Sequence, residues 1–399
     1  MACFISYTAA YVARLNLSAA LGSIIRTLCI SDAQGGLFQT VFAMVYAIGQ
    51  LVNGSIVDRI SARYYIVAGL MLSGVCNMIF GMVKSYRVMV LLWGLNGVAQ
   101  SMLWTPIVKV MAVWFKGTRR TRASFGISFT LVLGNVTAWA VSGFLATQVG
   151  WRLSFIVPAI VVVIGAVIAY IMLRDKPEPY ETTGEEDMVY YPVHKHNTMS
   201  LREIFVKTGL GMVLVCCVCN GFVRDGIITW GPVIISNLNN GHGIGSVLSS
   251  LLIPILNLIG VLLARRVYSL LGNNARLSVG CLMAVSSVLA LALHAVCVTL
   301  VSCALLLGLC CSATYGINPM LTQLIPMEYE KAGRVALVAG LSDCFIYLGS
   351  SLAGIVIGAV SDSNGWSAVF LLWCIVAVGS MVFAFLSLHG GKQLEYQND

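Results

Sequence analysis

Two arginines interrupt apolar stretches of the chain that are long enough to cross a bilayer. Arg14 and Arg224 stand 210 residues apart, at matching places in the two halves of the sequence. A charged side chain at the centre of a bilayer costs between about 2.5 and about 17 kcal/mol, depending on the method, so it marks a functional site by default. A guanidinium group is always charged and offers a planar fork of donors that suits phosphate or carboxylate. The pair therefore predicts an anion-binding site within the membrane.

Polar side chains recur at helical spacing around these arginines, because positions i, i+3, i+4 and i+7 share one face of a helix. The further residues expected to bind the substrate are Tyr7, Tyr11, Tyr46, Gln50, Asn135, Asn220, Tyr315, Asn318 and Tyr347. Asn96 and Gln100 form a similar stripe, whereas every third predicted helix has none. The pattern predicts a wet central cavity with peripheral supporting helices. The alternative is that these polar side chains only bond neighbouring helices.

Two acidic residues lie in the same apolar segments. Asp225 directly follows Arg224, and Asp343 lies in the predicted helix 333–358. Neighbouring residues of a helix point about 100° apart, so Asp225 is expected to face away from a cavity-facing Arg224. Two interpretations stay open for the carboxylates. They carry a proton that is coupled to transport, or each forms a fixed pair with an Arg or Asn. If Asp343 faces the cavity, it is also expected to pair with an Arg when the substrate leaves.

Composition predicts an all-α integral membrane protein. The 399 residues are 58% hydrophobic and 10% charged, with a mean hydropathy of +0.88, whereas a soluble chain carries roughly 25% charged residues. Lipid leaves backbone groups no partner outside a helix or a closed barrel. Apolar runs long enough to cross a bilayer predict twelve helices, at 1–21, 33–54, 62–83, 87–112, 123–146, 152–173, 205–230, 244–264, 276–294, 298–324, 333–358 and 366–388.

The distribution of basic residues explains the net charge of +8. With a cytoplasmic N-terminus, 17 of the 24 Lys and Arg residues fall in cytoplasmic loops or the helix ends next to them, four in or next to outside loops, and the other three, Arg14, Lys109 and Arg224, within helices. This is the positive-inside bias of a protein with both termini in the cytoplasm. The charge is therefore a topology signal and does not indicate nucleic-acid binding. We expect a multi-pass protein of the plasma or inner membrane.

The chain divides into two similar halves. We expect an N-terminal six-helix bundle at 1–173, a cytoplasmic linker at 174–202, a C-terminal six-helix bundle at 203–388 and a cytoplasmic tail at 389–399. The motif Gly150-Trp151-x3-Phe155 returns 215 residues later as Gly365-Trp366-x3-Phe370. Parallel six-helix repeats are one transporter architecture, and they place the substrate site near the bilayer midplane at the repeat interface.

The loop after the second predicted helix, Gly54-Ser-Ile-Val-Asp58-Arg59-x3-Arg63, resembles the loop signature of the major facilitator superfamily. The resemblance runs from Tyr7 to about Ser387 and implies that superfamily's fold of two pseudo-symmetric bundles. It also implies that Asp58, Arg59 and Arg63 form a conformational clasp between helix ends.

Within that superfamily, the chain is most similar to the organophosphate:phosphate antiporters, the glycerol-3-phosphate and hexose-phosphate carriers. The similar segments include Tyr11-Val-Ala-Arg14-Leu-Asn16, Trp104-Thr-Pro106-Ile-Val-Lys109 and Phe222-Val-Arg224-Asp-Gly226. The resemblance implies that Arg14 and Arg224 bind the substrate phosphate. The chain departs from the family at Leu15, Gln50 and Leu133, where the family pattern can have Lys, Lys and His, so its cavity is less basic.

These observations predict a secondary active carrier of a small organic anion that works by alternating access, with organophosphate/phosphate exchange as the first hypothesis. Two unpaired arginines would resist occlusion of an empty site, which favours exchange. A proton-coupled symporter of a carboxylate or other small anion is the alternative, and a transporter-like sensor is a minor one. The sequence shows no Ser/His/Asp set and no metal cluster, so we expect a protein that is not an enzyme and has no cofactor or metal. We also expect the protein to be a monomer.

Overall fold

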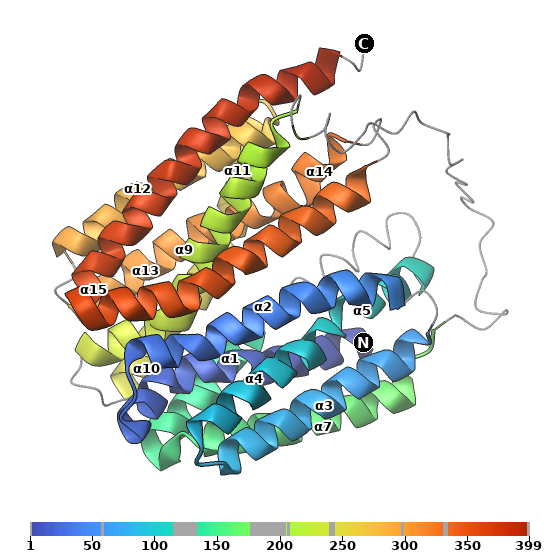
Figure 1. The fold of residues 1–399 in the computed structure, drawn as a ribbon, viewed down its shortest axis with the longest axis vertical. Coiled ribbons are helices and arrows are strands. Elements are labelled where there is room, and N and C mark those ends of the chain that lie inside the picture. The colour runs from blue at the N-terminus through green and yellow to red at the C-terminus, as the bar shows by residue number, and fades with distance from the viewer. Residues whose placement is uncertain are drawn as a thin grey trace. The chain divides into compact units, whose positions relative to one another are not determined.

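The computed structural model describes residues 2–56, 60–114, 134–175, 205, 208–238, 244–296, 299–329 and 334–396, and helices dominate this part of the chain (Figure 1). The helices are α1 (Ala2–Leu28), α2 (Asp32–Ile56), α3 (Ala62–Met82), α4 (Tyr86–Ser101), α5 (Trp104–Trp114), a helix at 134–145 that continues into η1 (Ala146–Gly150), α7 (Leu153–Met172), α9 (Leu210–Leu238), α10 (Ile244–Ser250), α11 (Leu252–Leu270), α12 (Ala275–Val296), α13 (Leu300–Pro319), η3 (Met320–Leu324), α14 (Ile325–Met327) and α15 (Val335–Tyr396).

Ten segments within the described residues are long and apolar enough to cross a membrane. One of them, Leu337–Leu388, is 52 residues long and covers most of the eleventh predicted helix and all of the twelfth. The predicted helix 123–146 is described only from residue 134 onward. The predicted linker 174–202 lies outside the described residues after residue 175, and α15 continues to Tyr396, beyond the predicted end of the last membrane helix.

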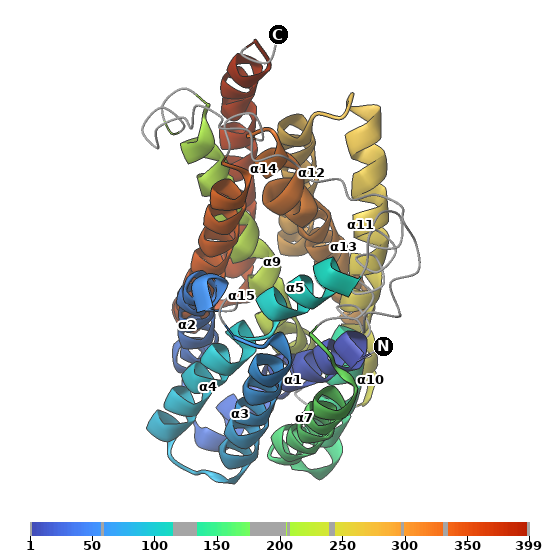
Figure 2. The same cartoon turned by 90° about the vertical axis from the view of Figure 1, so that its right-hand side faces the viewer.

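The chain forms two compact units. The first unit comprises Met1–Leu28 and Met44–Pro192, and the second comprises Cys29–Ala43 and Val193–Asp399. In the first unit, α3 packs along α7 (Figure 2). In the second unit, α9 packs mainly against α15, and α11 packs against α13. Residues 29–43 join the second unit because Thr40 bonds to the backbone of Ser351, while the Asp362 carboxylate accepts from the backbone N–H groups of Asp32 and Ala33 at 2.8 Å.

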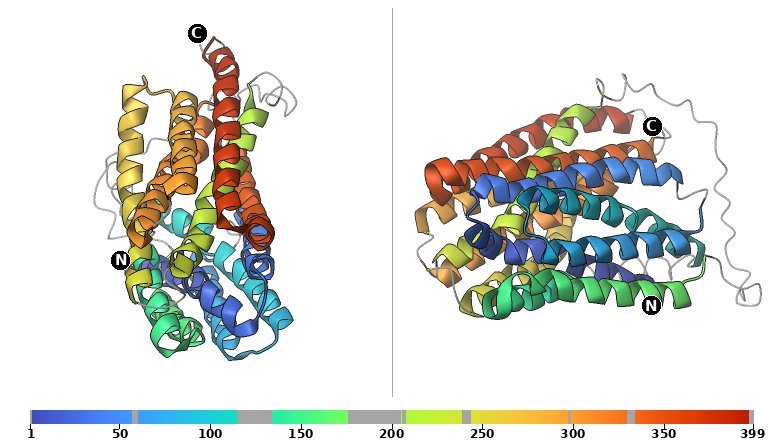
Figure 3. Two further views of the ribbon diagram at one scale, coloured as in Figure 1. Left: turned by 90° about the vertical axis from the view of Figure 1, so that its left-hand side faces the viewer. Right: turned by 60° about the horizontal axis from the view of Figure 1, so that its bottom comes forward.

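Glycine produces the same backbone feature in each half of the chain. Gly150 has a φ of 134° and Gly365 has a φ of 76°, both in the left-handed region that residues with a Cβ rarely adopt. A Cβ at either position would meet no atom within 4 Å, so the dihedral angle rather than space selects glycine. At Gly365, α15 turns sharply into two arms that run back along each other (Figure 3). The Gly-Trp repeat of the sequence is therefore a repeated bend before the last helix of each half.

A buried polar network joins α1, α3 and α4 in the first unit. Asn16 donates to the Asn77 side chain at 2.8 Å, and Asn77 donates to the carbonyl of Ala13 at 3.1 Å. Asn96 and Gln100 are also buried, and their amides donate to backbone carbonyls of α1 at 3.2 and 3.0 Å. The expectation that the stripe of Asn96 and Gln100 faces a wet cavity is therefore wrong. Pattern alone cannot distinguish water from the backbone of a neighbouring helix as the partner of a polar side chain.

An arginine at the second residue of a helix serves a similar purpose in each unit. Arg63 opens α3 and donates to the carbonyl of Tyr170 near the end of α7, and its guanidinium carbon lies 4.7 Å from the centre of the Tyr170 ring. Arg276 opens α12 and donates to the carbonyl of Ser387 at 2.6 Å. Both arginines therefore tie the start of the third helix of a half to the end of its sixth helix.

The Arg276 contacts also include the neighbouring segments of the second unit. Its guanidinium donates to the carbonyl of Thr208 at 2.9 Å and forms an ion pair with Glu328 at 2.8 Å. The Thr208 hydroxyl is 2.9 Å from the Tyr329 hydroxyl. Burial raises the pKa of the Tyr329 phenol, so this group stays neutral and can act as a donor. A buried charge is tolerated here because its donors have partners.

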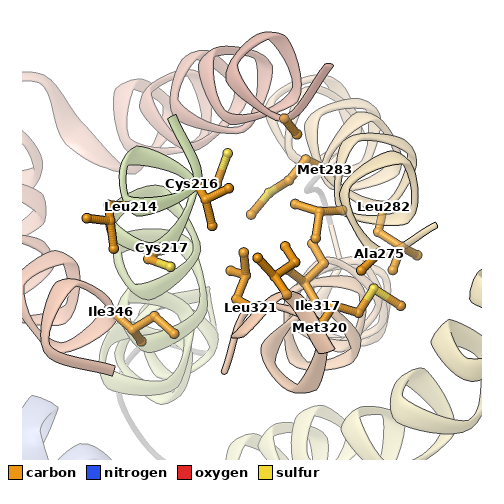
Figure 4. Close-up of a cluster of buried hydrophobic side chains, with 14 of the residues drawn as sticks. Leu214, Cys216, Cys217, Ala275, Leu282, Met283, Ile317, Met320, Leu321 and Ile346 are labelled. Carbon is orange, nitrogen blue, oxygen red and sulfur yellow. The ribbon is translucent and has the colours of Figure 1, made fainter. Parts of the chain in front are cut away.

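The core of the second unit positions α9. Cys216, Cys217, Met283, Ile317 and Leu321 belong to this core, and Figure 4 shows their side chains clustered between the helices that carry them. The two cysteines are 1% and 0% exposed, as expected for small packing residues.

Glycines bring α9 and α15 to close backbone contact. A Cβ on Gly221 would lie 1.9 Å from the carbonyl oxygen of Ile346, and a Cβ on Gly349 would lie 2.0 Å from that of Val218. Small residues at helix contacts are the usual means of close approach in membrane proteins. This contact holds α9, which carries Arg224, directly against α15.

We predict that Gly221→Ala lowers the melting temperature of the purified protein, because the added methyl group overpacks the α9–α15 contact at a cost of about 1–3 kcal/mol. Gly379→Ala is the matched control, since a Cβ at that helical position meets no atom within 4 Å. The control gains about 0.5–1 kcal/mol from lower chain entropy. Thermal unfolding in detergent measures both, and an equal shift for the two variants would contradict the predicted packing.

Candidate functional site

In the first unit, aromatic rings surround Arg14. Its guanidinium carbon lies 4.7 Å from the centre of the Tyr46 ring and 5.7 Å from that of Tyr11. Such cation–π contacts contribute about 0.5–2 kcal/mol. The two rings therefore help to hold the Arg14 side chain in place.

The Tyr46 ring is itself held by a polar chain. Gln50 donates to the Tyr46 hydroxyl at 2.7 Å, and Thr105 donates to the Gln50 carbonyl oxygen at 3.2 Å. Tyr46 and Gln50 are one helical turn apart on α2, so the predicted stripe is a connected pair. Thr105 at the start of α5 was not among the predicted site residues, and a single threonine in an apolar run carries no signal of its own.

The remaining predicted residues of the first unit extend this cluster. Tyr7 lies edge-on to Tyr11 at 5.1 Å between ring centres, and it is 5.2 Å from the Trp104 ring. Asn135 is buried next to Gly134, where a Cβ would lie 2.5 Å from that of Tyr11. The structure thus places Tyr7, Tyr11 and Tyr46 close to Arg14 or to one another, and Gln50 joins them through Tyr46.

In the second unit, Arg224 is held by a carboxylate and an amide. Its Nε donates to Asp225 Oδ1 at 2.8 Å and its Nη2 donates to Asp225 Oδ2 at 3.0 Å. Its Nη1 donates to the Asn318 side chain, and its guanidinium carbon is 5.7 Å from the centre of the Tyr315 ring. The side chains of Arg224 and Asp225 are only 11% and 12% exposed. The pair is buried and bidentate, the strongest form of this interaction.

This pair corrects two expectations. Asp225 does not point away from Arg224, because the long arginine side chain bends across the angle between neighbouring residues. The argument that two unpaired arginines resist occlusion of an empty site is also weakened, because Arg224 already has a counter-ion in Asp225. Of the two interpretations considered for Asp225, the structure shows the charge pair with Arg224.

Three other predicted residues lie in the same unit. Tyr347 and Asp343 lie on α15, which packs against α9, the helix that carries Arg224. Asn220 is one turn before Arg224 on α9 and is 0% exposed, and neither of its amide atoms has a hydrogen-bond partner in the described part of the chain. Orphaned buried amides are uncommon and mark sites for water or a ligand. Asp58 and Arg59 of the predicted clasp lie outside the described residues, as does position 133.

The arrangement suits recognition of an anion rather than covalent chemistry. The described residues contain no group of three or more His, Cys, Asp or Glu that could hold a metal ion. The sequence pattern of the Major Facilitator Superfamily matches residues 3–344.

The chain belongs to the Major Facilitator Superfamily.

Comparisons along the whole chain agree with this assignment. The glycerol-3-phosphate transporter of Bacillus subtilis is 25% identical over 98% of this chain and 92% of its own length. The membrane sensor protein UhpC of Escherichia coli is 25% identical over 94% of this chain and 88% of its own. A solved structure of a bacterial homologue of the human lysosomal transporter Spinster has a TM-score of 0.73 at 15% identity, over 99% of this chain and 96% of that one.

Membership confirms several predictions. The protein has the all-α, multi-pass membrane fold of this superfamily, and it is not an enzyme. The relatives also confirm the resemblance to the organophosphate:phosphate antiporters.

We predict that Tyr46→Leu weakens binding of inorganic phosphate by about 2- to 30-fold, the equivalent of the cation–π contribution of about 0.5–2 kcal/mol. Tyr46→Phe should lose less, because it keeps the ring under Arg14 and removes only the hydroxyl that accepts from Gln50. A thermal-shift titration with phosphate measures both affinities. A larger loss for Phe than for Leu would show that the hydroxyl, not the ring, matters.

Proposed function

We propose that the protein is a secondary active carrier that exchanges a small phosphorylated organic anion for inorganic phosphate by alternating access. Each compact unit supplies one arginine from within a membrane segment, Arg14 or Arg224, and places at least one tyrosine ring beside it. This duplication is the observation that carries the proposal. The similarity to a glycerol-3-phosphate transporter supports a phosphate ester as the substrate.

Each part of the proposal follows from the chemistry of the residues. A guanidinium binds phosphate through parallel N–H donors, and both arginines are required for transport. The tyrosine and amide groups of Tyr7, Tyr11, Gln50, Asn135, Asn220 and Tyr347 contact the rest of the substrate. The clasp of Asp58, Arg59 and Arg63 stabilises one conformer.

The carrier works as a monomer in the plasma or inner membrane, with both termini in the cytoplasm and without cofactor, metal or nucleic acid. The positive-inside distribution of Lys and Arg supports this orientation.

A proteoliposome assay tests the proposal. Uptake of radiolabelled glycerol 3-phosphate should depend on phosphate inside the vesicles, and a pH gradient alone should not drive it. Uptake driven by the pH gradient without internal phosphate would instead establish the proton-coupled symporter, with Asp343 as the candidate proton carrier. The carboxylate substrates of that alternative can be tested in the same vesicles.

A transporter-like sensor is the second candidate, and the similarity to the membrane sensor protein UhpC favours it. A sensor would bind the phosphorylated compound in a thermal-shift assay and show no flux under either gradient. Flux and binding must therefore be measured on the same preparation.

We predict that Arg14→Lys and Arg224→Lys each reduce the initial rate of exchange more than about tenfold. A lysine keeps the charge but replaces the planar fork by a single ammonium group, and loss of a charge-assisted hydrogen bond costs about 1.5–3 kcal/mol. Arg26→Lys is the matched control, because Arg26 is exposed in the last turn of the same helix as Arg14. Near-normal exchange by either site variant would rule out the two-arginine site.

A further inference from the structure

Most hydrogen-bond donors of Arg224 are already used by the protein. A guanidinium has five N–H donors. Two of them, on Nε and Nη2, bind the carboxylate of Asp225, and a third, on Nη1, binds Asn318. At most two donors, one on each terminal nitrogen, remain for a ligand. The group that should recognise a substrate anion is therefore occupied by an anion of the protein.

We propose that Asp225 is a built-in competitor for Arg224, which the substrate must displace and which sets the charge that a substrate needs. This inference rests on the proposed function and adds a specificity-determining residue to it. Asp225 acts as an internal stand-in for the substrate: it neutralises Arg224 when the site is empty and yields the guanidinium when a phosphate arrives.

The burial of the pair gives Asp225 this role. Both side chains are about nine-tenths buried, and removing one partner of a buried pair leaves an uncompensated charge, which is strongly unfavourable. A ligand that displaces Asp225 from Arg224 leaves the Asp225 carboxylate as such an uncompensated charge. The ligand must therefore interact with the site more strongly than the carboxylate that it replaces.

This requirement separates phosphate from simple carboxylates. A monocarboxylate offers the guanidinium the same bidentate contact that Asp225 already makes, and Asp225 has the advantage of being attached to the same helix. A phosphate ester carries up to two charges and three terminal oxygens, so it can bind Arg224 and other donors together. Competition by Asp225 therefore excludes monocarboxylates more strongly than phosphates.

The opposite role for Asp225 makes an opposite prediction. If the carboxylate only held Arg224 in position for the substrate, its neutralisation would release the guanidinium and weaken binding. If Asp225 competes with the substrate, its neutralisation strengthens binding. The sign of the change in affinity thus distinguishes a competitor from a positioning residue.

The test compares the full-length wild-type protein with Asp225→Asn, which keeps the size of the side chain and one acceptor oxygen. Calorimetric titration with inorganic phosphate should give a Kd at least about tenfold lower for the variant, within the usual 5- to 150-fold range of coupling between sites. Titration with acetate should show a larger gain, so the ratio of the acetate Kd to the phosphate Kd should fall. The variant is less stable before ligand is added, so affinity rather than melting temperature is the readout.

Glu328→Gln is the matched control. It breaks the other carboxylate–arginine pair described in the second unit, between Glu328 and Arg276, and should leave both affinities within about twofold of the wild type because it does not touch Arg224. Phosphate binding by the wild type together with unchanged or weaker binding by Asp225→Asn overturns the inference and leaves the proposed function standing. An unchanged acetate-to-phosphate ratio overturns the specificity role. Failure of both proteins to bind phosphate overturns the inference and the proposed function together.

Discussion

The dry interior of the bilayer is the constraint on which the rest of this structure depends. A polar group in hydrocarbon has no water to bond to, so each such group needs a partner within the protein. The constraint explains why Asn16 and Asn77 bond to each other and why Asn96 and Gln100 bond to the backbone of α1. It also explains why Arg224 has a carboxylate beside it. Many buried polar residues of the described part of the chain are accordingly gathered into networks, and the unpartnered amide of Asn220 is an exception.

The two units satisfy this constraint with similar backbone bends and helix contacts, but different groups contact Arg14 and Arg224. Each unit bends at a glycine before its last helix and ties that helix to an arginine at the start of its third. Arg14, however, lies against the rings of Tyr46 and Tyr11, whereas Arg224 is neutralised by Asp225. A bidentate ion pair to a carboxylate is a strong restraint on a guanidinium. The described contacts therefore hold the two arginines by different interactions.

Much of the site could be anticipated because its signals are local. A charge within an apolar run is visible without a structure, and so is the one-turn spacing of Tyr46 and Gln50, which the structure joins by a hydrogen bond. The contacts of Arg224 with Tyr315 and Asn318 bring together residues of two predicted stripes. The prediction that Asp225 faces away from Arg224 was wrong because helical geometry gives only the direction of each Cβ atom. The long arginine side chain can bend back toward its neighbour. Thr105 gave no signal, since its role depends on α5 lying beside α2.

The sequence by itself determined the membrane environment, the helices, the repeat of the two halves and the positions of the two arginines. All of these follow from composition and short-range periodicity, which are properties of single helices and of the price in free energy of placing charge in lipid. Only the tertiary structure decided which polar groups bind each other. A polar stripe looks the same whether it faces water, a backbone carbonyl or a carboxylate, and only the packing of helices far apart in the chain determines its partner.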